Sequence, residues 1–308
     1  MKKLLLVLAS ALLIFGCISL PGGTSLPKNL SVPTVPNVTQ AANQSVTAPV
    51  VQTCSPSYSF TDPSPAVLGG TGALSVSATC AANKAISVEV AGVSAGQSTV
   101  PGDSAVLNFN LPASADGTVK VEVKSDGASI HSADWEVKPI GYSNTAGIDN
   151  DQVSIKNWKA VAFDVQNPIS VKKAGAYLRR LQSMTLQGST VIVEIRSDSG
   201  GAPGAVVSSG SLPITGVTMT PNWIYFPMNA QLQKGRYWLV FKVDQAGSAI
   251  VSDVVNIQYY SADKTKPGNQ DHMKMDLQRN EDTQQWEETT WDTLAYDRNY
   301  AFSVSSSG

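Results

Sequence analysis

Side chains that could support catalysis are few in this chain. Its two histidines, His131 and His272, are too few and too far apart in sequence for the usual zinc site of two or three histidines. No H-E-x-x-H motif occurs. The neighbouring carboxylates Glu287 and Glu288 would face opposite sides of a strand and could not share a substrate. We therefore expect no catalytic residues and no enzymatic activity.

Aromatic side chains are the best candidates for ligand binding. Exposed rings on a sheet stack against sugar faces, and nearby carboxylates and amides bind the hydroxyl groups. The stretch EDTQQWEETTWDTLAYD combines such rings with acids. The candidate ligand-binding residues are Trp223, Trp286, Trp291 and Tyr296. The alternative is that these rings are buried in an edge strand or a turn, as large aromatic side chains mostly are.

Three aspartates could supply oxygen ligands to calcium. Asp149 and Asp151 lie in GIDNDQ, and Asp198 lies in the glycine-rich stretch SDSGGAPG. Calcium often binds loop oxygens of this kind, but the glycine and glutamate spacing of an EF-hand is missing. We expect no cofactor, and a structural calcium ion at these aspartates is the one alternative.

The N-terminus carries the features of an export signal. Lys2 and Lys3 precede an apolar run of 13 residues, 4–16, which as a helix would rise about 20 Å against a hydrocarbon core of about 30 Å. A run of this length is typical of a signal peptide. The stretch LLIFGC resembles the lipobox of prokaryotic lipoproteins, with Phe15 in place of the usual small residue. The resemblance implies that Cys17 is the lipid anchor. An uncleaved anchor helix and simple secretion remain the alternatives, and all three place most of the chain outside the cytoplasm, anchored in the first two cases at the extracellular face of the cell membrane.

Residues 17–53 are predicted to form an extended linker. The segment holds five prolines, many Ser and Thr residues and one charge, a composition that cannot bury enough surface to fold. All three N-x-[ST] sequons of the chain fall here, at Asn29, Asn37 and Asn43. N-glycosylation would stiffen and protect the linker, but sequons also arise as by-products of a polar composition.

Residues 54–139 are predicted to form a small antiparallel β-sandwich. GALSVSATCAANKAISVEV alternates apolar and polar residues, and Ser125, Asp126 and Gly127 are predicted to turn a hairpin. The unit resembles an immunoglobulin-like domain in a general way. In an exported chain Cys54 and Cys80 are expected to form a disulfide. Closing a loop of about 26 residues would stabilise the fold by about 3 kcal/mol.

Residues 140–308 are predicted to form a larger β-sandwich. GRYWLVFKV alternates two faces, with Leu239 on one and Trp238 on the other. The motifs VEIRSDSGGAPGAVVSSGSL, LQKGRYWLVF and WDTLAYDRNYAFSV resemble a jelly-roll domain of prokaryotic extracellular and phage-tail proteins. The resemblance implies a second all-β unit behind the signal or anchor helix of residues 1–16.

Composition restricts the classes of partner that the chain is expected to bind. A net charge of −2 with 15% charged residues argues against nucleic acid, which needs clustered Lys and Arg. The expected partners are the membrane, through the N-terminal anchor, and a glycan or surface protein. We expect a non-catalytic cell-surface lipoprotein whose C-terminal sandwich binds or adheres. The alternatives are a purely structural envelope component and an extracellular carbohydrate-active enzyme.

Overall fold

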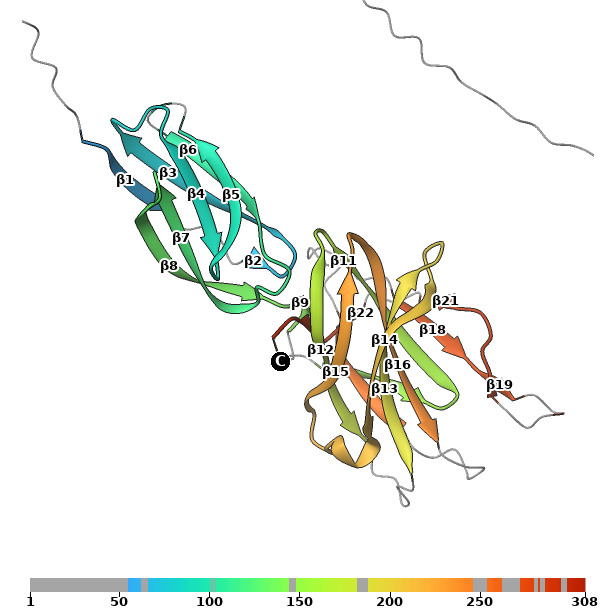
Figure 1. Ribbon diagram of the computed structural model, residues 1–308. Coiled ribbons are helices and arrows are strands. Elements are labelled where there is room, and N and C mark those ends of the chain that lie inside the picture. Colours follow the sequence, from blue (N-terminus) through green and yellow to red (C-terminus); the bar gives the residue numbers. More distant parts are fainter. Residues whose placement is uncertain are drawn as a thin grey trace, which may run out of the picture. The chain divides into compact units, whose positions relative to one another are not determined.

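The computed structural model is built almost wholly of β-strands (Figure 1). Its one helical element in the described part is a single turn, η1 (Ile214–Gly216). The prediction of an all-β chain is confirmed. The described residues are 55–61, 66–100, 102, 104–143, 148–181, 188–245, 254–261, 272–279, 282, 286–294 and 298–307.

The predictions for the N-terminal segment concern residues outside this described set. The signal or anchor segment, Cys17, the linker and the sequons at Asn29, Asn37 and Asn43 all lie outside the described residues. Within the described part no helix has the length and apolarity needed to cross a membrane. Every described residue belongs to one compact unit, residues 53–308, and the boundary between residues 139 and 140 stays a prediction.

Two small sheets enclose the first hydrophobic cluster. Its buried residues alternate along the strands, as Leu107 and Phe109 do in β6, because successive side chains of a strand point to opposite faces. One sheet has the order β1-β3-β6 and the other β2-β8-β7-β4-β5. The strands are β1 (Ser57–Thr61), β2 (Ala66–Val67), β3 (Thr71–Thr79), β4 (Ala85–Val90), β5 (Val93–Thr99), β6 (Ser104–Asn110), β7 (Gly117–Ser125) and β8 (Ala128–Lys138).

The hairpin between β7 and β8 turns where the sequence predicts. Asp126 has φ 49° and Gly127 has φ 83°, and two positive φ values in a two-residue loop are the mark of a type I′ turn. His131 of β8 is half-buried, and its ring stacks on Phe60 at 4.3 Å. The sequence prediction missed this contact because Phe60 belongs to β1, in the other sheet.

Cys80 follows β3 directly and has φ 60°. It is a disulfide-bonded cysteine, whereas its expected partner, Cys54, lies outside the described residues. Ser57 of β1 pairs with Thr79 of β3, which brings the chain just after residue 54 alongside Cys80. The Cys54–Cys80 pairing stays a prediction that this register supports.

The remaining strands follow one continuous hydrogen-bonded path that folds back on itself. The path runs β14-β13-β16-β11-β10-β17-β12-β23-β9, with β15 paired to β12, β18 to β11 and β21, and β22 to β17. β10 and β11 pair only at Ser154 and Asn157, so the path divides there into two layers. The layer with β11, β13, β14, β16, β18 and β21 is called sheet I below, and the layer with β9, β10, β12, β15, β17, β22 and β23 is called sheet II.

These strands have the following bounds. They are β9 (Ile140–Tyr142), β10 (Ile148–Ser154), β11 (Asn157–Val165), β12 (Ile169–Arg180), β13 (Ser189–Asp198), β14 (Pro203–Pro213), β15 (Asn222–Leu232), β16 (Gly235–Gln245), β17 (Val254–Ser261), β18 (His272–Asp276), β21 (Asp292–Thr293), β22 (Arg298–Tyr300) and β23 (Phe302–Ser305). A separate short pair joins β19 (Gln278–Arg279) to β20 (Trp286–Glu287).

The larger hydrophobic core lies between sheets I and II. It takes Val193 and Phe241 from sheet I and Ala176, Leu178 and Phe226 from sheet II. Each of these alternates with a residue that points away from the core, as predicted for GRYWLVFKV. Both sheets therefore carry a second, outer face on which a site could lie.

Hydrogen bonds join the strands on the two sides of residue 140. The Asn167 side chain donates to the Gly69 carbonyl at 2.9 Å, and the Ser170 amide donates to the Ala113 carbonyl at 2.8 Å. Near the end of β23 the Asp116 carboxylate accepts bonds from the Ser305 hydroxyl at 2.5 Å, the Ser306 hydroxyl at 2.6 Å and the Ser306 amide at 3.0 Å. One carboxylate thus fixes the end of the last strand.

Replacing this carboxylate should destabilise the fold. Asp116→Ala leaves three donors without their charged acceptor, and we expect the free energy of unfolding to fall by about 2 kcal/mol. Urea denaturation of the full chain, followed by tryptophan fluorescence, measures this. Asp134→Ala removes an exposed aspartate and should change stability by less than about 0.5 kcal/mol. Equal effects of the two substitutions would contradict the assignment.

Candidate functional site

Three aromatic rings gather on the outer face of sheet II. Tyr177 of β12 pairs in register with Trp223 of β15, and Tyr225 lies two residues further along β15. The Tyr177 and Trp223 ring centroids are 5.8 Å apart, and those of Trp223 and Tyr225 are 6.2 Å apart with planes only 17° from parallel. Tyr225 is 47% exposed. These three residues are called the aromatic strip below.

Gly175 makes room for the strip. It pairs with Tyr225 across the sheet, and a Cβ atom placed on it would lie 2.7 Å from the Cδ1 and Cε1 atoms of the Tyr225 ring. Any larger residue at 175 must push the ring aside. The Lys173 ammonium lies 5.1 Å from the centroid of the same ring, a cation–π distance. The ring is held by the sheet beneath it and by a neighbouring cation.

A buried ionic group marks the outer face of sheet I. The Glu194 carboxylate binds Arg196 through Nε at 2.8 Å and Nη2 at 2.7 Å, and it also pairs with Lys242. The side chains of Glu194 and Arg196 are 7% and 8% exposed. Both cations lie against the Trp158 ring, Lys242 at 4.7 Å and Arg196 at 5.7 Å. Glu194, Arg196, Lys242 and Trp158 are called the ionic cluster below.

The ionic cluster belongs to a covered layer. Trp158, Trp238 and Met275 form a small hydrophobic cluster on this face, and Trp291 packs against it as a half-buried residue. Glu288, from the same segment as Trp291, reaches Arg196 at 3.6 Å. The charges of the ionic cluster are therefore paired with one another and lie beneath the segment that contains Glu288 and Trp291. This arrangement stabilises the packing of that segment on sheet I.

Two of the three candidate calcium ligands already accept hydrogen bonds from other groups of the protein. Asp198 accepts the Trp238 indole N–H at 2.7 Å and the Gly201 amide at 3.1 Å. Asp151 is buried and accepts the Tyr300 hydroxyl at 2.5 Å. The Asp149 side chain lies outside the described residues. Among the described residues no three acidic, His or Cys side chains gather into a metal-binding group, and calcium binding stays a prediction.

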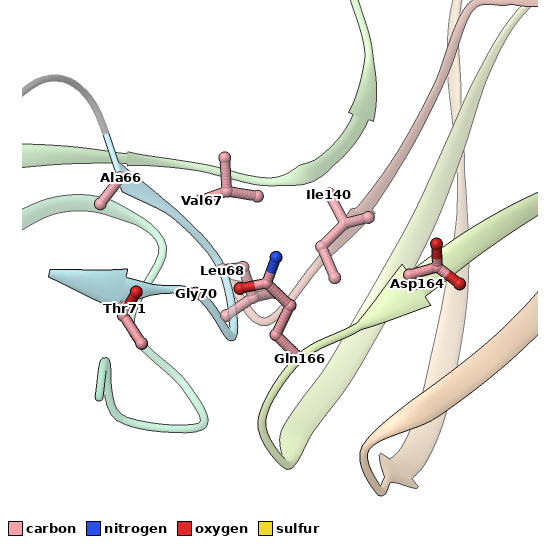
Figure 2. A pocket seen from close by; sticks show the side chains of 8 residues that line it. All are labelled: Ala66, Val67, Leu68, Gly70, Thr71, Ile140, Asp164 and Gln166. Atoms are coloured by element: carbon pink, nitrogen blue, oxygen red, sulfur yellow. The ribbon is translucent and has the colours of Figure 1, made fainter. Parts of the chain in front are cut away.

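A hollow of about 260 Å³ lies where β2, β9 and the end of β11 meet. Figure 2 shows its side chains coming from the β2–β3 turn, from Ile140 and from the chain around Asp164. The polar side chains that line it are Thr71, Asp164 and Gln166. Among the described residues that line it, Asp164 is the one carboxylate, and there is no histidine or cysteine.

The predicted ligand residues do not come together as one site. Trp223 joins the aromatic strip on sheet II, whereas Trp291 packs on the outer face of sheet I. Tyr296 and the side chain of Trp286 lie outside the described residues. The sequence analysis missed Tyr177 and Tyr225. Their signal is present in AYLRR and NWIYFP, where aromatic residues alternate with core residues, but only the pairing of β12 with β15 brings them together.

Comparisons with known proteins do not assign the chain to a family. No family model and no curated protein matches the chain. One solved structure that resembles it is a glycosyl hydrolase family 2 member from Bacteroides cellulosilyticus, at 10% identity and a TM-score of 0.18. The match covers 79% of this chain but 24% of the hydrolase, so the chain spans about a quarter of that protein's length. A likeness of this size carries no argument about fold or activity.

The buried carboxylate of the ionic cluster should be important for stability. Glu194→Ala leaves Arg196 and Lys242 without their main counter-charge, and breaking a buried pair costs about 3–5 kcal/mol. The matched control is Glu89→Ala, which breaks the Glu89–Lys124 pair, whose side chains are 28% and 26% exposed, and should cost less than about 1 kcal/mol. Thermal unfolding of the full chain measures both, and similar melting temperatures for the two variants would contradict this assignment.

Proposed function

We propose that this protein is a non-catalytic cell-surface module that binds glycan through the aromatic strip. The observation that carries the proposal is the placement of Tyr177, Trp223 and Tyr225 side by side on the outer face of sheet II, with the Tyr225 ring half exposed. An apolar ring face that remains in water stacks well on the C–H face of a sugar.

The two outer faces differ in what covers them. Sheet I carries the ionic cluster and Trp291 in a small cluster of its own, with Glu288 bound to Arg196. In the strip of sheet II the Tyr225 ring is 47% exposed. This contrast favours sheet II as the binding face and gives Trp291 a packing role.

A non-catalytic role fits the groups around the strip. The chemistry of glycoside cleavage usually takes two carboxyl groups on either side of the scissile bond. The strands that carry the strip and its neighbours, β12, β15, β17 and β23, contain neither Asp nor Glu. Binding by stacking and hydrogen bonding needs no such pair.

The cell-surface part of the proposal rests on the N-terminal sequence. A lipid on Cys17 would hold the protein at the extracellular face of the membrane, and the linker of residues 17–53 would carry the sandwich away from it. The Cys54–Cys80 disulfide would close the first β-sandwich in that oxidising location. The jelly-roll resemblance belongs to the same proposal.

Binding to a glycan array tests the strip. We expect saturable binding by the full chain and a loss of at least tenfold in affinity for Trp223→Ala and for Tyr225→Ala, because each removes a stacking surface. Gly175→Val should also weaken binding, since it displaces the Tyr225 ring without removing an aromatic residue. The control is Met219→Ala, which truncates a side chain that is 54% exposed outside the strip.

The same array tells the two sheets apart. Trp291→Ala should leave affinity within about twofold of wild type, since the proposal puts Trp291 in a packing role. Loss of binding in Trp291→Ala with normal binding in Trp223→Ala would move the site to sheet I. Absence of binding to every glycan would overturn the proposed function.

The anchor has its own test. Cys17→Ala removes the thiol to which the lipid would attach, so we expect the protein either to leave the membrane fraction or to accumulate as uncleaved precursor. Fractionation of cells and immunoblotting measure both outcomes. A variant that is processed and retained in the membrane like wild type would show that Cys17 carries no lipid.

A further inference from the structure

We propose that the ligand of the aromatic strip is an anionic glycan, one that carries carboxylate or sulfate groups, and that Lys173 and Arg179 bind those groups. The inference deepens the proposed function and rests on it. It names the chemical class of the glycan from the charges that flank the rings.

The strand that supplies Tyr177 is strongly basic. β12, with the sequence ISVKKAGAYLRR, contains four cations and no acid. Its pairing partners β15, β17 and β23 contain no charged residue at all. In a chain whose net charge is −2, this is a local excess of positive charge on one sheet.

Register places two of these cations on the face of the strip. Leu178 of β12 and Ile257 of β17 pair with each other in the core, so the next pair, Arg179 and Asn256, points to the outer face. Lys173 lies on that face beside Tyr225. Six residues separate Lys173 from Arg179, a distance of about 20 Å along a strand. The aromatic rings lie between them.

Arg179 has no acidic partner among the described residues. It is half-buried, and its Nε has no hydrogen-bond partner. Among the described residues no acidic side chain forms an ion pair with its guanidinium. Two neighbours on the same face repeat the pattern, since Asn256 Oδ1 and Ser303 Oγ are also buried without a partner. Buried polar groups are usually paired. Of the six buried side-chain atoms without a partner among the described residues, three lie on this face and two, Asn157 Oδ1 and Trp158 Nε1, lie on β11 of sheet I.

Two carboxylates near this face accept hydrogen bonds from hydroxyl groups. Asp116 accepts bonds from Ser305 and Ser306. Asp151 of β10 is buried and binds Tyr300. The positive charge at Arg179 therefore has no compensating acid that the described residues reveal.

Rings flanked by cations select for a particular ligand. The rings stack on sugar faces whether the sugar is charged or neutral. An arginine guanidinium binds carboxylate or sulfate through two parallel N–H donors, and a lysine adds a point charge. An acidic chain that crosses the strip could meet Lys173 at one end and Arg179 at the other, contacts that a neutral glycan would not make.

The test compares four polymers on the full chain. The probes are polygalacturonate, heparin, neutral dextran and a DNA oligonucleotide, each measured by calorimetry at low and high NaCl. We expect polygalacturonate or heparin to bind at least tenfold more tightly than dextran, with affinity that falls as salt rises. Lys173→Gln with Arg179→Gln should reduce that affinity at least tenfold. Lys234→Gln, which removes an exposed lysine in the β15–β16 turn, should not.

Each outcome separates the two proposals. Dextran binding that depends on Trp223 and Tyr225 but not on Lys173 and Arg179 would overturn the anionic ligand and leave glycan binding in place. DNA that binds as tightly as the acidic glycans, with no loss in Trp223→Ala, would show general polyanion attraction and also overturn this inference. Loss of acidic-glycan binding in both the aromatic and the cation variants would support it.

Discussion

The pairing of β12 with β15 is the constraint on which the candidate site depends. β12 buries Ala174, Ala176 and Leu178 in the larger core, and the alternation of strand side chains then turns its other residues outward. The register against β15 sets Tyr177 beside Trp223 and Gly175 beneath Tyr225. A shift of one residue would reverse both faces. The burial of small residues on one side therefore fixes the geometry of the rings on the other.

The outer faces of the two sheets carry the same residue types in different surroundings. On sheet I, Trp158 lies between cations whose charge is met by Glu194, and Trp291 adds a further apolar layer. On sheet II, aromatic rings and cations occur again, but no carboxylate stands among them on β12, β15, β17 or β23. Aromatic and charged composition alone does not distinguish a packing layer from a binding surface. On sheet I the Glu194 carboxylate joins the cations into a packed layer.

The sequence predicted those features that depend on residues close together in the chain. The alternation in GRYWLVFKV gave the two faces of β16 correctly, and the Asp126–Gly127 turn lies where its residue types require positive φ. It did not predict which aromatic residues meet, because Tyr177 and Trp223 are joined by a long-range pairing that no periodicity reveals. Trp291 illustrates the same limit, since a tryptophan among acids has the composition of a sugar site and yet packs on a neighbouring strand. The stacking of His131 on Phe60 was missed for the same reason, because the two residues belong to different sheets.

The missing side chain at Gly175 has an entropic consequence. The Tyr225 ring rests where that side chain would stand, so it is already confined in the free protein and has little rotamer freedom left to lose when a ligand arrives. A preorganised, open surface of this kind has few barriers to either association or release. Under the proposed glycan binding, several copies engaging one polymer chain would add avidity to each single contact.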